Sequence, residues 1–142
     1  MDPSAETLSF SSIAAADIEA FARQKEKIVT AVTDHLFRCD VLASTLADTE
    51  KARLARECVK IFTENFLATV KYQLPAALIE YLDWLRGFLR SREFPAAFIP
   101  QMISGMRNAV HAFLEDAGSD DICAALRRLR ARELGQAREV GA

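Results

Sequence analysis

A row of leucines in the middle of the chain constrains the fold more than any other feature. Residues 78 to 95 read LIEYLDWLRGFLRSREFP. On a helix, at about 100° per residue, the leucines at 78, 82, 85 and 89 fall within roughly 60° of one another. This leucine seam predicts one helix face buried in a core. We expect the surrounding chain to be helical as well.

The composition supports an all-α fold. Apolar residues make up 51% of the 142 residues, and the chain has only 5 Gly and 4 Pro. Abundant Ala, Leu and Arg favour helix over strand, and this length suits one domain with a single core. We predict a single-domain helical bundle of about five to six helices. A globin-like stack is the alternative, because both arrangements need the same amphipathic faces.

The domain is expected to occupy most of the chain. Residues 1–12 lack apolar periodicity and predict a flexible N-terminal lead-in. Residues 13–135 carry the helical pattern, and residues 136–142 are expected to form a flexible C-terminal tail.

Apolar spacing and capping residues predict where the helices begin and end. One long helix is expected from Asp17 to about Phe37, with Asp17 capping its start. One or two further turns are expected at 40–48, followed by a helix that Asp48 or Thr49 caps and that breaks near Gln73. The leucine-bearing helix is expected to begin at Pro75 and to end at 91–93. A helix from about Ile99 to a cap at Gly118 and a last helix from Ser119 or Asp120 to Gly135 complete the prediction.

Tyr81, Trp84 and Phe88 form a second stripe on the leucine-bearing helix, centred about 85° from the seam. A helix in a small domain needs an apolar arc of only about 100°, so this stripe requires a further contact. Three interpretations stay open: the stripe is core, it is a homodimer interface, or it lines a pocket for a flat cofactor. On the opposite side, Asp83 and Arg86 are expected to pair weakly in solvent.

The two histidines, His35 and His111, are each expected to be a surface residue or a hydrogen-bonded core residue. His111 lies on an otherwise apolar helix, so it is also the candidate axial ligand of a haem. The middle helices, where a globin has its proximal ligand, contain no His. We therefore expect no cofactor, with a tetrapyrrole as the alternative.

Sequence motifs for catalysis are absent. The chain has no G-x-S-x-G, no G-x-G-x-x-G and no carboxylate cluster with metal spacing, and we predict a non-enzymatic protein. Cys39, Cys58 and Cys123 are widely spaced and are expected to be free thiols in a reducing cytoplasm. Cys58 and Cys123 fall on apolar faces, which predicts inert core thiols.

The charge distribution argues against nucleic acid and membrane partners. The 18 basic and 20 acidic residues give a formal charge of -2, which provides no steering field for either polymer. The arginines of the RRLRAR segment at 127–132 are expected to complement the dipole of their own helix, with nucleic-acid contact as the less favoured alternative because no aromatic or turn motif accompanies them. No signal peptide or long apolar run is present, so a cytoplasmic protein is expected.

The quoted stretch, with its Tyr, its Trp-Leu pair and its basic-x-x-Pro ending, resembles the helical modules that precede corrinoid-binding domains in bacterial sensory and regulatory proteins. The resemblance covers about residues 60–115. It implies a bundle against the upper face of the cofactor, with Tyr81, Trp84 and Phe88 near the ligand. The D-x-H-x-x-G ligand loop of those proteins is missing.

In size, helix order and the lack of a proximal His, the chain is also similar to the non-haem sensor globins that form N-terminal domains of bacterial stressosome proteins. Those domains are dimeric. Both resemblances imply a regulatory or sensory domain that acts as a homodimer or through a protein partner. A sensor module that binds haem, cobalamin or a bilin is the alternative.

Overall fold

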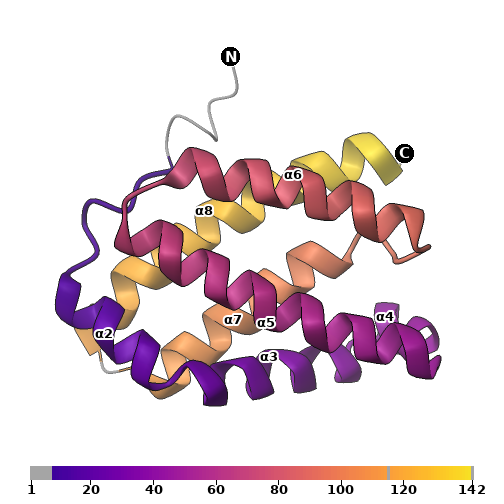
Figure 1. Ribbon diagram of the computed structural model, residues 1–142, viewed down its shortest axis with the longest axis horizontal. Coiled ribbons are helices and arrows are strands. Elements are labelled where there is room, and N and C mark those ends of the chain that lie inside the picture. Colours follow the sequence, from indigo (N-terminus) through magenta and orange to yellow (C-terminus); the bar gives the residue numbers. More distant parts are fainter. Residues whose placement is uncertain (1–7, 115, 142) are drawn as a thin grey trace.

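The chain is helical along almost all of its described length. The computed structural model describes residues 8–114 and 116–141, and side chains at 8–114 and 119–136. In this part of the chain the helices are α2 (Ala15–Arg23), α3 (Lys25–Arg38), α4 (Asp40–Leu46), α5 (Thr49–Lys71), α6 (Pro75–Ser91), α7 (Phe98–Phe113) and α8 (Asp116–Gly141). The predicted all-α bundle is confirmed, with more helices than expected (Figure 1).

The predicted boundaries around the start of α5 and the junction between α5 and α6 are correct. At the start of α5, Asp48 Oδ1 accepts hydrogen bonds from the backbone N–H groups of Glu50 (2.9 Å) and Lys51 (3.2 Å). Between α5 and α6 the backbone turns at Gln73, whose φ of 54° is left-handed. Pro75 then occupies the first turn of α6, where a missing N–H costs no helical hydrogen bond.

The prediction of one long helix from Asp17 to Phe37 is wrong. The chain leaves helical geometry at Gln24 (φ -97°, ψ 5°), which separates α2 from α3. The N-cap of α2 is Ala14, and Asp17 lies inside its first turn. The apolar pattern continues across the break because both helices bury residues in the same core. The apolar spacing therefore predicted correctly which face of each of the two helices is buried, but it did not predict the break between the helices.

The N-terminal lead-in differs from the prediction at residues 8–12. Leu8 and Phe10 are buried in the core, and the Phe10 ring lies edge-on to Phe66 with 6.1 Å between centroids. Burial of two large apolar side chains offsets the entropy of ordering this short segment. The remainder of the predicted lead-in, residues 1–7, lies outside the described residues.

The last helix is longer than predicted at both ends. It begins at Asp116, so the predicted caps at Ser119 or Asp120 are wrong, and Gly118 lies within α8 and does not cap α7. It also continues through Gly135 to Gly141, so most of the predicted tail is helical, and residue 142 lies outside the described residues. One glycine costs a helix only about 1 kcal/mol, which the packing of α8 against α7 outweighs.

Helix α7 is the central helix of the bundle. It packs most extensively against α3 and α8 (Figure 1). The contact with α3 is close at Gly105, where an added Cβ would lie 3.0 Å from Cδ2 of His35. Because residue 105 has no side chain, the His35 ring of α3 can pack directly against the backbone of α7.

Helix α6 lies on the outside of the bundle, with α5 beside it and α8 behind it in the view of Figure 1. All four residues of its leucine seam are buried, at most 3% exposed, which confirms the prediction for this face. No helix in the described part of the chain is long and apolar enough to span a membrane.

Candidate interaction surface and buried ion network

Tyr81, Trp84 and Phe88 form one continuous stack along α6, here called the aromatic ladder. The ring centroids of Tyr81 and Trp84 are 6.2 Å apart with planes at 29°, and those of Trp84 and Phe88 are 5.3 Å apart with planes at 12°. The stack continues with a cation–π contact, because Cζ of Arg92 lies 5.2 Å from the Phe88 centroid. The ladder is thus a preformed surface feature.

The interpretation of the ladder as core is wrong for Trp84, which is 61% exposed. Tyr81 and Phe88 are half-buried and pack against the core. The physical reason is angular: Trp84 lies about 130° around the helix from the centre of the leucine seam, beyond the reach of the bundle. The chain's only Trp is therefore supported from both sides by aromatic rings and presented to solvent.

Tyr81 fixes one end of the ladder to the side of α5. Its hydroxyl is buried and has no hydrogen-bond partner among the described residues. Burial, and then the neighbouring Cys58 of α5, raise the pKa of Tyr81. Burial, followed by the charge of Glu57, raises the pKa of Cys58 to about 11, so this thiol is protonated at neutral pH. The contact between Tyr81 and α5 is therefore one of neutral groups.

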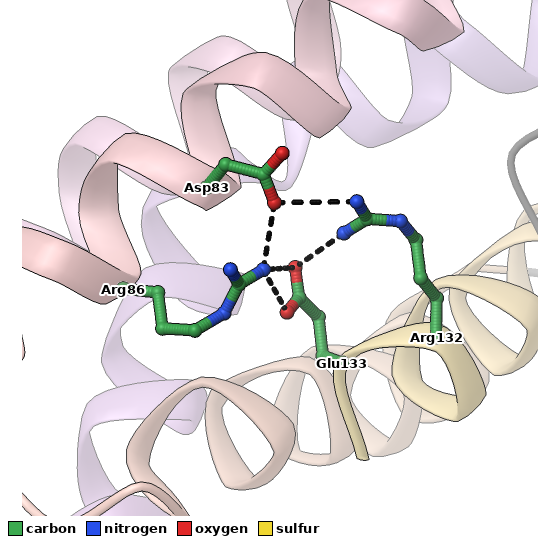
Figure 2. A network of polar contacts seen from close by, with 4 residues as sticks. All are labelled: Asp83, Arg86, Arg132 and Glu133. Atoms are coloured by element: carbon green, nitrogen blue, oxygen red, sulfur yellow. Dashed lines mark hydrogen bonds and ion pairs between the residues drawn. The ribbon is translucent and has the colours of Figure 1, made fainter. Parts of the chain in front are cut away.

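The other side of α6 carries a charged network that reaches α8, here called the ion network (Figure 2). Nη2 of Arg86 lies 2.7 Å from Oδ1 of Asp83 and 2.9 Å from Oε2 of Glu133. Arg132 bridges the same two carboxylates, with Nη2 3.2 Å from Asp83 and Nη1 3.3 Å from Glu133. Burial lowers the pKa of Arg86, but hydrogen bonds to Glu133 and Asp83 outweigh it and raise that pKa overall.

The expected pair of Asp83 and Arg86 forms, and its Asp83 side chain is 47% exposed. What was not expected is that Arg86, only 20% exposed, also pairs with Glu133, which is 1% exposed. The sequence carried a signal for the burial of Glu133, because this residue continues the spacing of four, three and four set by Ile122, Leu126 and Leu129. All three of those apolar residues are buried. A carboxylate at the next seam position predicts a buried charge, and a buried charge requires partners.

A small pocket of about 50 Å³ adjoins the ion network, between the end of α6 and the start of α7. Its walls include Leu89, Phe94, Phe98 and Ile99, with Arg86 and Glu133 on the polar side. Pockets that hold drug-sized ligands have volumes of about 300–1,000 Å³. This one has room for a few water-sized groups and is too small for a tetrapyrrole.

The histidines lie away from the aromatic ladder. His111 is exposed in the last turn of α7, whereas the ladder is on α6. His35 is partly buried, and its Nε2 lies 3.1 Å from Oε1 of Gln101 on α7. The structure therefore brings together Tyr81, Trp84 and Phe88 but places the fourth candidate residue, His111, on a different helix.

The three cysteines are free thiols, as predicted, and Cys58 and Cys123 are buried. Within the described residues, no group of three or more His, Cys, Asp or Glu side chains is placed to hold a metal ion. No protein-family model, curated protein or solved structure matches this chain. The exposed aromatic ladder and the ion network lie on opposite sides of the same helix.

Proposed function

We propose that this chain is a non-enzymatic regulatory domain of the bacterial sensory type, which acts by binding a protein through the aromatic ladder. The observation that carries the proposal is the 61% exposure of Trp84 within the stack of Tyr81 and Phe88. Trp and Tyr are enriched among the residues that dominate binding energy at protein interfaces. A large aromatic side chain left in solvent also keeps the apolar area that a partner can bury.

The ladder is ordered before a partner arrives. Trp84 stacks with two half-buried rings, and the Arg92 guanidinium lies over the Phe88 ring. Immobilising a free side chain on binding costs about 0.5–1.5 kcal/mol, and a stacked Trp avoids part of that cost. The geometry is therefore favourable for recognition.

A signal can pass through α6 because this helix carries both features. The ladder lies on one side of the leucine seam, and Asp83 and Arg86 lie on the other side, paired with α8. A partner that favours a shifted position of α6 changes the distances in the ion network. Binding would then select between two packings of α6 on α8, which is the mechanism we propose for regulation.

The proposal is tested by cross-linking from the surface itself. Trp84 is replaced with the photoreactive residue p-benzoyl-phenylalanine in the full chain, and the protein is irradiated in its host cells. The control carries the same residue in place of Tyr72, which is 65% exposed but outside the ladder. We expect a discrete adduct from position 84 that position 72 does not give. Equal adducts from the two positions, or none from position 84, would contradict the proposal.

The second candidate function is binding of a tetrapyrrole, which the exposed apolar area of Trp84 beside the half-buried Tyr81 and Phe88 favours. An absorption spectrum of the protein, as isolated and after mixing with haem, cobalamin or a bilin, separates the two functions. A new visible band that is lost in Trp84→Ala supports the second candidate. Unchanged ligand spectra in every mixture remove it.

A further inference from the structure

We infer that the partner bound by the aromatic ladder is a second copy of this chain, paired through α6 in antiparallel orientation. This inference rests on the proposed function and goes further, because it names the partner and the register. Three features of α6 support it: the open space beside Gly87, the charge of Glu80 on the exposed face, and the charge of Arg92, the C-cap residue of α6, beside Phe88.

The solvent face of α6 combines one large residue with small ones. At about 100° per residue, Trp84 shares an arc of roughly 80° with Ala77, Glu80, Gly87 and Ser91. All five are exposed. A Cβ added at Gly87 would have no atom within 4 Å, so the helix surface beside Trp84 is open. The face is thus a projecting indole next to a shallow gap, and these two shapes are complementary to each other.

An antiparallel pair matches these shapes between two copies. With the twofold axis between residues 85 and 86, Trp84 of each copy lies opposite Gly87 of the other. A C2 interface uses the same patch on both subunits, so one projection and one gap per copy are sufficient. The interface would then cover two Trp84 side chains, one from each copy.

The charges select the same orientation. At 1.5 Å per residue, Glu80 lies about 8 Å from this axis on one side, and Arg92 lies about 10 Å away on the other. Antiparallel pairing therefore sets Glu80 of each copy at nearly the same level along the helix axis as Arg92 of the other, on the side where Arg92 lies over Phe88, while parallel pairing would set like charges at the same level. Neither residue makes an ion pair with the described residues, although the Arg92 guanidinium already lies over the Phe88 ring. The antiparallel arrangement also places the positive end of each helix dipole beside the negative end of the other, which is favourable.

The dimer should be weak. Helix α6 has 17 residues and spans about 25 Å. One helix face on each copy buries less than the roughly 1,200 Å² of total area typical of stable complexes. We therefore expect a monomer–dimer equilibrium in the micromolar range, which is suitable for regulation by concentration or by a ligand.

Sedimentation velocity of the full chain between about 5 and 500 µM tests the pairing. Wild type should shift from monomer to dimer over this range. Gly87→Gln fits the folded monomer, because the space around the position is open, but fills the gap and should leave only monomer. The matched control is Gly135→Gln on α8, where the space is equally open, and it should dimerise like wild type.

Charge reversal tests the register. Glu80→Arg alone and Arg92→Glu alone should each weaken dimerisation by about tenfold or more, because like charges then face each other. The double variant restores opposite charges and should recover most of the wild-type affinity. Circular dichroism confirms folding, which is expected because both residues are exposed.

Three results would overturn the self-pairing: a wild-type protein that is monomeric over the whole range, a Gly87→Gln variant that still dimerises, or a double charge variant without recovery. The cross-link at position 84 separates this failure from that of the proposed function. An adduct with the mass of two chains supports both. An adduct with a different mass, from a chain that is monomeric alone, overturns self-pairing and leaves the proposed function standing. No adduct overturns both.

Discussion

Nη2 of Arg86 lies 2.9 Å from Oε2 of Glu133, a residue 47 positions further along the chain. This contact, with Arg132 and Asp83 around it, fastens α6 to α8 by long side chains (Figure 2). Removing Glu133 from water is costly, and the two guanidinium groups offset that cost only while their geometry is kept. The network therefore specifies where α6 lies on α8.

Glu133→Gln should lower the free energy of unfolding by about 3 kcal/mol, because it leaves two guanidinium groups without their buried counter-charge. Glu50→Gln is the control: it breaks the exposed pair with Arg53 (3.1 Å, side chains 69% and 80% exposed) and should cost less than about 1 kcal/mol. Urea unfolding of the two variants and wild type measures both values. Equal effects at positions 133 and 50 would mean that the ion network contributes no more than a surface pair.

Gly105→Ala should destabilise the protein by about 1–3 kcal/mol, since the added Cβ meets the His35 ring at 3.0 Å in the contact between α3 and α7. Gly135→Ala is the matched control and should stabilise α8 by about 1 kcal/mol, because no atom lies within 4 Å of its Cβ. Thermal unfolding measures both changes. In a double-mutant cycle, His35→Ala should make Gly105→Ala less costly, and strictly additive effects would argue against the contact.

Tyr81→Phe should leave stability unchanged or raise it by about 1 kcal/mol, because it removes a buried hydroxyl without a hydrogen-bond partner in the described residues and keeps the ring. Tyr81→Ala is the comparison, and it should be destabilising because the half-buried ring is lost. Chemical unfolding with the same denaturant measures both variants. A marked loss of stability in Tyr81→Phe would show that the hydroxyl has a partner after all.

Stability should decline above pH 9 in a way that depends on Cys58. Its pKa is about 11 in the folded protein against 9.0 as the ordinary value, so the unfolded chain loses this proton first as the pH rises. The protonated Cys58 thiol therefore contributes fully to the free energy of unfolding below pH 9, and this contribution is lost as the pH rises from 9 to 11. The free energy of unfolding should fall by at most about 1.4 kcal/mol per pH unit in this range. The raised pKa of Tyr81 acts in the same direction at higher pH.

Urea midpoints of wild type and Cys58→Ala, measured from pH 8 to pH 11, check this dependence. The alanine variant should be less stable at pH 8, and the difference from wild type should become smaller between pH 9 and pH 11. A constant difference across that range would rule out the titration of Cys58 as a cause.

Local signals predicted the parts of the fold that depend on neighbours in sequence. Asp48 caps α5 and Pro75 starts α6, as expected, because capping and proline chemistry act within one helical turn. The break at Gln24 and the continuation of α8 through Gly135 were missed. The apolar pattern runs across the first break without interruption, and a single glycine costs a helix only about 1 kcal/mol, so neither local signal marked the observed boundary.

The candidate site was predicted in part. The angular count found Tyr81, Trp84 and Phe88 as one stripe, and the structure places them in one stack. It did not find that Trp84 is exposed, because exposure depends on how far the bundle extends around α6. The ion network was missed because it joins residues that are far apart in the sequence.

The sequence by itself determined that this protein is helical, that the leucine seam of α6 is core, and that three aromatic side chains share one side of that helix. Each of these follows from backbone geometry, which repeats every 3.6 residues whatever the chain packs against. Only the tertiary structure decided that Trp84 faces solvent and that Arg86 is the partner of Glu133. Exposure and pairing are properties of two surfaces that meet, and only the folded chain brings those surfaces together.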